Sequence, residues 1–409
     1  MALTKNPKLA LIPSGYKASK VYSVLPSDGV GDFDFSRSGN ATRVNKQGLI
    51  ETVSSNVPRL NYPLIDGVVS GCPSLLLENS ATNYIVGSNS FIDWSGGLVI
   101  SENYGISPDG SLNSSKISGS GLIFRSPNRP TGNYVFSVFA KNINEDSSVI
   151  QLRIDIPASL SSEFDLSNGT IVSTNTDDAK IEDYGNGWYR CIVIQNNDGI
   201  ANAVIANGET ESLSCEIFGA MLEENNFVTS YIPTTSSTAT RSAETCNNAG
   251  DVNTFNDSEG VLFWDGYIPN DGNEKILQIS DGTNTNVVRI FARANGDDVR
   301  FQITDGGVNS LSQEIPISSN NYYKISLKYK ENDISIWVNG FELYNVNNGS
   351  MPSNLNTLEF NSDGGANAFY GNTKQIQYFD TALNDTDLEE LTSWVSFTDM
   401  ANSQLYTIQ

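Results

Sequence analysis

The segment Ser230–Glu244, SYIPTTSSTATRSAE, constrains the fold of this chain more than any other stretch. Ser and Thr make up most of it, no apolar periodicity runs through it, and Pro233 fixes one φ angle and removes a backbone donor. These properties predict an extended connector rather than a helix or a core strand. Because the stretches on both sides have β patterns, we expect a semi-stiff joint between two β domains.

The length supports this division. A chain of 409 residues exceeds what one hydrophobic core usually supports, so two to three units are expected. A hydrophobic content of 38 %, with 18 Phe and 17 Tyr, is typical of a globular β-rich protein. The predicted fold class is all-β. Its four parts would be an irregular attachment segment, a jelly-roll sandwich, an extended linker and a second sandwich, at residues 1–83, 84–231, 232–250 and 251–409.

The charge balance excludes some partners. There are 47 acidic and 24 basic side chains, a formal net charge of −23, which repels nucleic acid and anionic lipid. No run of eighteen apolar residues occurs, and the N-terminus MALTKNPKLALIPSGYK lacks the apolar centre of a signal peptide. We therefore expect no nucleic-acid partner, no membrane insertion, and synthesis in a cytoplasm.

Histidine is absent, and cysteine is scarce. Ser-His-Asp and Cys-His nucleophilic sites, histidine general bases and ordinary zinc enzyme sites all need an imidazole, so they are excluded. Cys72, Cys191, Cys215 and Cys246 are too scattered for a disulfide scaffold, and the sequence predicts buried free thiols.

Short alternating strands mark both β domains. Apolar residues fall at every second position in YVFSVFAKN (134–142) and IQLRIDI (150–156), whereas GWYRCIVIQ (187–195) is apolar on both faces, as in a strand covered on two sides. With Gly, Asn and Asp turns between them, these strands predict a jelly-roll sandwich. After residue 251, VLFWDGYI, KILQIS, VVRIFA, VRFQIT and ISIWVNG follow at regular spacing and predict the second sandwich.

Two local patterns in the second sandwich are more specific. In YYKISLKYK (322–330), the alternation predicts one core face and one solvent face, the latter formed by Tyr322, Lys324, Ser326 and Lys328. Asn339-Gly340 tolerates the positive φ angles of a tight hairpin.

One helix is expected, in NDTDLEELTSWV. Asn384 is a good N-cap, and Asp385 and Asp387 lie where the helix dipole favours anions. Leu388, Leu391 and either Trp394 or Val395 would share one face, with which the helix packs on the second sandwich.

No arrangement of residues supports catalysis. Glycosidases need two carboxylates facing one cleft, and the E-x-D-x-E strand pattern of lectin-fold glucanases is absent. Glu209 and Glu211 have the right spacing for one strand face, but NGETES reads as a solvated loop. The chain is therefore predicted not to be an enzyme.

Sugar binding needs an exposed aromatic ring beside hydrogen-bonding groups. Tyr184 in EDYGNGW, Tyr267 in WDGYIPNDGN and Tyr370 in AFYGN have such neighbours, although a turn or core role explains each of them more simply. Trp94 in FIDWSGG fits either role. Trp188, Trp264 and Trp337 lie inside apolar strands and are assigned to cores.

No cofactor is expected. Loops rich in Asp and Asn, such as SDGTNTN, offer the hard oxygen ligands that calcium prefers. However, no complete calcium-binding loop is present, and turn chemistry explains these residues equally well. A structural calcium ion is therefore an alternative, with no residue assigned to it.

Basic residues crowd into the first segment, in contrast to the acidic remainder; they are Lys5, Lys8, Lys17, Lys20, Arg37, Arg43, Lys46 and Arg59. This asymmetry favours an attachment surface for an acidic partner. The alternative is that these are solvated loop charges.

Taken together, these blocks resemble tail and receptor-binding structural proteins of tailed bacteriophages, particularly those that end in a laminin-G or concanavalin-A-like lectin domain. The resemblance covers nearly the whole chain and depends on the order of blocks that are weak individually. They are FDFSRSGNATRVNKQGLIE, NVPRLNY, CPSLLLENSATN, GWYRC, FGAMLEENNFVTSYIPT, TATRSAE, YYKISLKYKENDISIWVNG and FDTALNDTDLEELTS.

The resemblance implies a virion protein of a tail fibre or another external appendage, with a carbohydrate-binding-module-like middle domain and a lectin-like terminal domain. Such a protein would bind host-surface glycans multivalently without catalysis. Residues 1–83 would contact other virion proteins. Trimers are common among such fibres, but no heptad run imposes one here. The alternatives are a purely structural decoration or spacer protein and, more remotely, a polysaccharide depolymerase.

The joint contains a tripeptide that also occurs in the first segment. Ala239-Thr240-Arg241 repeats Ala41-Thr42-Arg43 of the first segment. We therefore expect Arg43 and Arg241 to act as anchors, with Arg241 pairing with backbone carbonyls or a carboxylate at the domain boundary.

Overall fold

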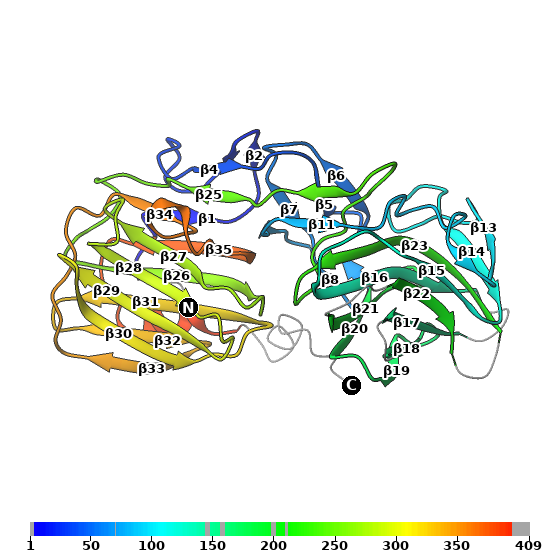
Figure 1. Ribbon diagram of the computed structural model, residues 1–409. Coiled ribbons are helices and arrows are strands. Elements are labelled where there is room, and N and C mark those ends of the chain that lie inside the picture. Colours follow the sequence, from blue (N-terminus) through cyan, green and yellow to red (C-terminus); the bar gives the residue numbers. More distant parts are fainter. Residues whose placement is uncertain are drawn as a thin grey trace.

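The computed structural model describes residues 4–69, 71–143, 148–155, 160–197, 202–208 and 212–394. Two antiparallel β-sandwiches stand side by side, and short strands of the N-terminal part and the joint run across one end of both (Figure 1). The predicted all-β class with two sandwiches and a short C-terminal helix is confirmed. Within the described residues, no helix is long and apolar enough to cross a membrane.

The middle sandwich encloses one core between two six-stranded sheets. The first sheet has the order β12 (Ser95–Gly96), β15 (Leu122–Arg125), β22 (Asn202–Asn207), β17 (Val149–Asp155), β18 (Ser161–Asp165) and β19 (Thr170–Thr174). The second has the order β13 (Val99–Ser101), β14 (Ser115–Gly119), β23 (Leu213–Glu224), β16 (Gly132–Asn142), β21 (Trp188–Asn197) and β20 (Asp178–Asp183).

The predicted alternation of this sandwich is confirmed. Side chains of β16 and β17 at every second position enter the core, including Phe136, Val138, Leu152 and Ile154; Ile156 lies outside the described residues. Strand β21 is covered on both faces, as expected, because Cys191 and Val193 face this core while Ile192 and Ile194 pack on the other side. The outer face of the second sheet is therefore also a packing surface.

The terminal sandwich pairs an eight-stranded sheet with a five-stranded sheet. The larger sheet has the order β33 (Phe341–Val346), β32 (Ile334–Val338), β31 (Asn321–Lys330), β26 (Glu259–Ile268), β35 (Gly371–Phe379), β10 (Ser74–Leu77) and β7 (Arg59–Asn61), and β1 (Leu9–Leu11) also pairs with β35. The smaller sheet has the order β30 (Val308–Pro316), β29 (Asp298–Asp305), β28 (Val287–Ala292), β27 (Lys275–Ser280) and β34 (Thr357–Glu359).

The N-terminal residues complete this sandwich instead of standing apart from it. Strands β1, β7 and β10 belong to its larger sheet, and Leu11, Phe33, Leu60, Leu75 and Leu77 lie in its core. Each of these strands has only three or four residues, and β10 and β35 are nearly 300 positions apart in the chain, for example at the pair Leu75–Thr373. Runs this short carry little periodicity, which is why this part of the sequence reads as irregular.

The joint is paired strand by strand. Within it, β24 (Ala239–Arg241) pairs with β11 (Ala81–Asn83), and just beyond it β25 (Thr245–Asn247) pairs with β4 (Phe33–Ser36). Tyr231 and Ile232 are buried against the outer face of the middle sandwich. The remaining short strands are β2 (Tyr16–Lys17), β3 (Lys20–Val21), β5 (Ala41–Val44), β6 (Ile50–Val53), β8 (Leu64–Ile65) and β9 (Val68–Val69).

The C-terminal helix α1 (Asp385–Thr392) forms as predicted. The Asn384 side chain accepts a hydrogen bond from the Asp387 backbone N at 2.9 Å, and Leu388 and Leu391 pack against Phe263 and Trp337. Val395 lies outside the described residues. A short 3-10 turn, η1 (Asp363–Gly365), precedes β35.

The predicted solvent face of β31 is wrong. Ser326 and Lys328 are buried on the side of the sheet against which α1 lies. Tyr322 is buried beside Tyr267 and Lys374, and only Lys324 is partly exposed. Lys328 Nζ forms an ion pair with Asp333 Oδ1 at 2.6 Å. The hairpin after β32 is confirmed, since Asn339 and Gly340 have φ angles of 51° and 88°.

The cysteine and tryptophan predictions are mostly confirmed. Cys191, Cys215 and Cys246 are buried free thiols, but Cys72 is exposed, which corrects the expectation for that residue. It lies in the loop before β10 and not within a strand. Trp188, Trp264 and Trp337 are buried in cores, as expected.

Candidate functional site

Three adjoining hollows form a cleft between the two sandwiches, called here the inter-sandwich cleft. The central hollow has a volume of about 200 Å³, the tyrosine hollow about 240 Å³ and the outer hollow about 740 Å³. Glu182 lines all three hollows, while Glu78 and Asn372 line the first two. These shared residues show that the hollows adjoin one another, with walls from both sandwiches.

Three of the four predicted ligand-binding residues line this cleft. Tyr184 of the middle sandwich lines the central and outer hollows, and Tyr267 and Tyr370 of the terminal sandwich line the tyrosine hollow. Trp94 does not join them. It is buried in the core of the middle sandwich, where its ring lies 5.3 Å from that of Phe91.

Tyr184 is held by the turn that connects β20 to β21. Gly185, Asn186 and Gly187 all have positive φ angles, which Gly and Asn tolerate best, and the Tyr184 backbone N donates to the Trp188 carbonyl at 2.8 Å. The tyrosine ring meets the ring of Phe139 edge-on at 4.8 Å. Burial, followed by the charge of Glu182, raises the pKa of Tyr184 to about 12, so its hydroxyl stays protonated and can donate.

Tyr267 is positioned by Tyr322 on β31 and by Asn320, just before that strand. Its ring lies 5.2 Å from that of Tyr322, and its hydroxyl donates to Asn320 Oδ1 at 3.3 Å. Burial, with a further contribution from the charge of Glu182, raises its pKa to about 12. Gly371 makes room beside it, because a Cβ at this position would lie 2.5 Å from the Tyr267 carbonyl oxygen.

Two asparagines and one carboxylate complete the polar lining. Asn320 lies beside Tyr267, and Asn372 accepts a hydrogen bond from Ser74 Oγ at 3.1 Å. Glu182 is exposed at the end of β20. Half-buried aromatic rings beside amide and carboxylate groups can bind the apolar face and the hydroxyls of a sugar.

Behind the floor of the cleft lies an ion network of five buried residues, each at most 9 % exposed. Glu244 accepts hydrogen bonds from Arg37 Nη1 at 2.7 Å and from Arg59 Nε at 2.9 Å. Glu78 pairs with Arg59 Nη1 at 2.7 Å and with Arg241 Nη1 at 3.1 Å. The network therefore links the N-terminal part with the joint.

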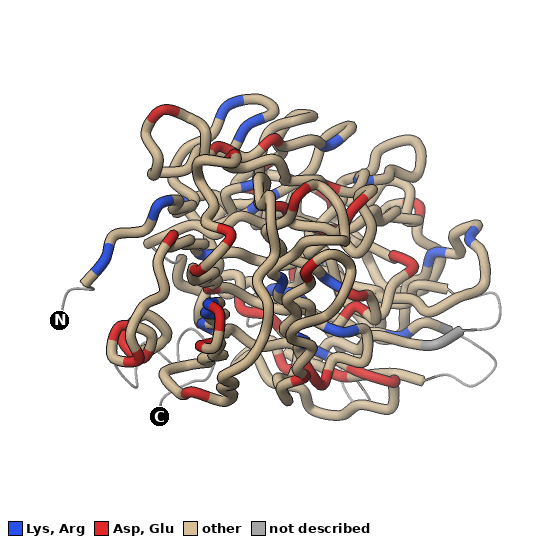
Figure 2. Tube along the Cα trace, turned by 90° about the vertical axis from the view of Figure 1, so that its left-hand side faces the viewer, with Lys and Arg blue, Asp and Glu red and all other residues tan. Residues whose placement is uncertain are grey.

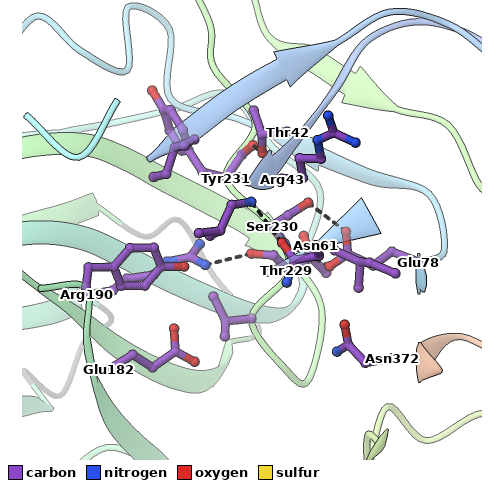
Figure 3. A pocket seen from close by; sticks show the side chains of 15 residues that line it. Thr42, Arg43, Asn61, Glu78, Glu182, Arg190, Thr229, Ser230, Tyr231 and Asn372 are labelled. Carbon is purple, nitrogen blue, oxygen red and sulfur yellow. Dashed lines mark hydrogen bonds between the residues drawn. The ribbon is translucent and has the colours of Figure 1, made fainter. Parts of the chain in front are cut away.

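The central hollow contacts this network through Glu78. Ser230 donates to Glu78 through its backbone N at 2.8 Å and through its hydroxyl at 2.6 Å. Arg190 Nη1 donates to the Thr229 carbonyl at 2.8 Å. Figure 3 shows Thr229 and Ser230 in the wall of the hollow, between Arg190 on one side and Glu78 on the other. The position of the wall thus depends on the network behind it.

The two predicted anchors have different surroundings. Arg241 is fully buried and pairs with Glu78 and with the Asn79 carbonyl, as expected from the sequence. Arg43 is partly buried and binds Glu51 within its own hairpin at 2.6 Å. Although the two Ala-Thr-Arg triplets share a sequence, only the second Arg belongs to the buried network.

Sequence reasoning missed Glu182, Asn372, Arg190, Arg37 and Arg59. The two network arginines had a signal, because they lie in the blocks FDFSRSG and NVPRLNY that carry the resemblance. Glu182 and Asn372 had none, since they lie 190 positions apart and meet only where the sandwiches adjoin. Glu209 and Glu211 lie outside the described residues. Within the described part of the chain, no group of three or more Cys, Asp or Glu side chains could hold a metal ion.

No protein-family model and no curated protein matches the chain. Some solved structures share a low structural similarity with it. The Ruminococcus gnavus IT-sialidase CBM40 bound to α2,3-sialyllactose is 14 % identical over 34 % of this chain and 84 % of that chain, with a TM-score of 0.30. Domain 4 of AbnA, a GH43 extracellular arabinanase from Geobacillus stearothermophilus in complex with arabinotriose, is 11 % identical over 37 % and 73 %, also with a TM-score of 0.30.

Domains LG4-5 of the mouse laminin α1 chain are 9 % identical to this chain, covering 80 % of it and 96 % of that chain, with a TM-score of 0.24. Similarities with TM-scores of 0.30 or below do not locate a binding site in this chain. The candidate site therefore rests on the geometry of the inter-sandwich cleft.

Proposed function

We propose that this protein binds glycans in the inter-sandwich cleft. The observation that carries the proposal is that Tyr184, Tyr267 and Tyr370, which belong to two different sandwiches, line one cleft. Asn372 and Glu182 line both the central hollow and the tyrosine hollow. A sugar ring stacked on a tyrosine would place its hydroxyls within reach of these polar groups.

We further propose that the protein is a component of a tailed-bacteriophage virion, in a tail fibre or another appendage that adheres to the host. The order of the sequence blocks supports this setting. Each cleft would bind weakly, and many copies on one particle would supply avidity. In a trimer, three clefts would face the same cell surface.

Residues 1–83 are proposed as the contact with other virion proteins. Arg37 and Arg59 are not available for this role, because they are buried in the ion network. Lys5, Lys8, Lys17 and Lys46 are exposed and are basic side chains that an acidic partner would meet. Acidic residues are spread over the rest of the molecule (Figure 2).

The proposed role is non-catalytic. Of the carboxylates lining the central hollow, Glu78 is unsuited to proton transfer. Burial alone would raise its pKa, but the charges of Arg241 and Arg59 and the bonds from Ser230 bring the pKa down to about 2. A general acid must hold a proton near neutral pH, and Glu78 does not.

Tyr267→Ala and Tyr184→Ala test the binding site. We expect each to weaken binding to the best-bound host polysaccharide about tenfold, since a stacking ring contributes on the order of 1 kcal/mol or more. Tyr104→Ala is the matched control, because Tyr104 is exposed and lies outside the cleft. Equal loss in the control, or no loss in either cleft variant, would contradict the proposal.

The two alternatives predict other outcomes. A purely structural decoration or spacer protein would bind no glycan on an array probed with the assembled oligomer. A polysaccharide depolymerase would release reducing ends from purified host capsule or lipopolysaccharide. Imaging of intact particles adds a second criterion, since a distal position favours adhesion and a position on the capsid or tail tube favours decoration.

A further inference from the structure

We propose that the inter-sandwich cleft selects uncharged glycans, and that the Glu182 carboxylate makes this selection. The inference rests on the proposed glycan binding and adds the class of ligand. It is drawn from the charged side chains that line the cleft and from which of them already have partners.

Glu182 occupies the centre of the cleft. It is exposed on β20 of the middle sandwich and lines all three hollows. Its charge acts on the hydroxyls of both Tyr184 and Tyr267, which belong to different sandwiches. A ligand stacked on either ring would therefore lie beside this carboxylate.

The cations of the lining are already engaged. Arg190, directly opposite Glu182 in the strand pairing, is 2 % exposed and donates to the Thr229 carbonyl at 2.8 Å and to Ser137 Oγ at 3.0 Å. Arg43 binds Glu51, and Lys180 lies 3.6 Å from Asp178 on its own strand. An anionic ligand would find no cation without a partner among these three.

The carboxylates of Glu182, Asp66 and Asp183 in the lining have few hydrogen-bond or ion-pair partners within the part of the chain that the structure describes. The Glu182 side chain has no hydrogen-bond or ion-pair partner among the described residues. Asp66 and Asp183 add two carboxylates to the outer hollow, and Asp183 accepts one hydrogen bond there, from the Gly185 backbone N at 2.7 Å. The cleft thus presents negative charge to a ligand, within a protein whose formal net charge is −23.

This arrangement favours one kind of sugar. A free carboxylate accepts hydrogen bonds from two neighbouring hydroxyls, and bonds to an ionised acceptor are about twice as strong as neutral ones. A uronic acid, a sialic acid or a phosphorylated sugar would instead place like charges together, and such a contact rejects the ligand. Neutral hexoses and N-acetylated hexosamines carry neighbouring hydroxyls and no negative charge, so they suit the cleft.

Glu182→Gln tests the inference, because Gln keeps the shape of the side chain and removes its charge. The measurement is binding of the full-length protein to an array of neutral, uronic-acid-containing, sialylated and phosphorylated glycans, with thermal unfolding as a check on folding. We expect wild type to prefer neutral glycans. In the variant, binding to these should fall about tenfold, and binding to acidic glycans should increase.

Glu342→Gln serves as the matched control, since Glu342 is an exposed carboxylate on β33 outside the cleft, and it should change neither class. Preference of the wild type for acidic glycans would overturn the inference but leave glycan binding in place. An unchanged profile of Glu182→Gln would do the same. If wild type binds no glycan at all, the proposed function falls together with the inference.

Discussion

At the scale of single residues, the main feature is that two buried carboxylates hold three buried arginines. Glu244 binds Arg37 and Arg59, while Glu78 binds Arg59 and Arg241. A buried ion pair often adds little net stability, but removal of one partner leaves an uncompensated buried charge. Each member of this network is therefore needed by the others.

Glu244→Gln should strongly destabilise the protein. Glu244 is 1 % exposed and is the carboxylate that Arg37 and Arg59 share, so its loss leaves excess buried positive charge. We expect a loss of about 3–5 kcal/mol in the free energy of unfolding, measured in urea. Glu51→Gln breaks the partly exposed pair with Arg43 and should cost about 1 kcal/mol or less. Similar losses in both variants would contradict this assignment.

The network also predicts a response to acid. The pKa of Glu78 is lowered in the folded protein to about 2, below its ordinary value of 4.5. A carboxylate with a lowered folded pKa contributes stability above its ordinary pKa and loses this contribution as pH falls toward the folded value. The free energy of unfolding should therefore fall between pH 5 and pH 2.

In Glu78→Gln this part of the pH dependence should disappear, even though the variant is less stable at neutral pH. Urea unfolding of both proteins at several pH values provides the comparison. A Glu78→Gln curve parallel to that of wild type would show that other carboxylates cause the acid response.

At the scale of elements, strand β31 is covered on both sides because α1 packs against its outer face. The helix has only eight residues, too few to be stable alone, so its cap and its packing must hold it. Asn384 accepts from the Asp387 backbone N, and Asp387 also accepts from the Thr4 backbone N at 3.1 Å. The cap thereby connects the helix to the N-terminal part of the chain.

Asn384→Ala should remove the capping bond and lower the free energy of unfolding by about 1 kcal/mol. The measurement is chemical or thermal unfolding, compared with Asp385→Asn, which changes one charge in the same turn but leaves the capping side chain in place. Asn384→Asp should restore most of the loss, because Asp also caps well. No loss in Asn384→Ala would mean that packing alone holds the helix.

At the scale of the whole molecule, the two sandwiches differ in how they are completed. The core of the middle sandwich is built from residues 85–222, a continuous stretch. The terminal sandwich takes strands β1, β7 and β10 from the beginning of the chain. The first and last parts of the chain therefore share one sheet, and the cleft lies where the two sandwiches meet.

Truncation should expose this difference. A chain of residues 84–231 should unfold cooperatively, because it contains the whole core of the middle sandwich. A chain of residues 251–409 should lack a cooperative transition, because one edge of its larger sheet and part of its core are missing. Calorimetry of both chains checks this, and a cooperative transition in the second would contradict it.

Part of the candidate site could be predicted locally. Tyr184, Tyr267 and Tyr370 were identifiable because each ring stands beside turn residues that suit a sugar. That the three rings would line one cleft could not be identified, because a local sequence pattern does not show which distant segment it will face in the fold. Trp94 had a similar setting and lies in a core instead, so exposure of an aromatic ring depends on packing that no local pattern contains.

The sequence by itself determined the all-β class, most core strands of both sandwiches, the β32–β33 hairpin and helix α1, because period-two alternation, Asn-Gly turns and N-caps are local physical signals. It also marked the joint as extended. Only the tertiary structure decided that the joint pairs with the N-terminal strands, that Arg37, Arg59 and Arg241 share two buried carboxylates, and that one cleft collects three tyrosines. These features depend on contacts between positions up to about 210 residues apart, where the driving force is burial and charge pairing in the folded chain rather than local preference.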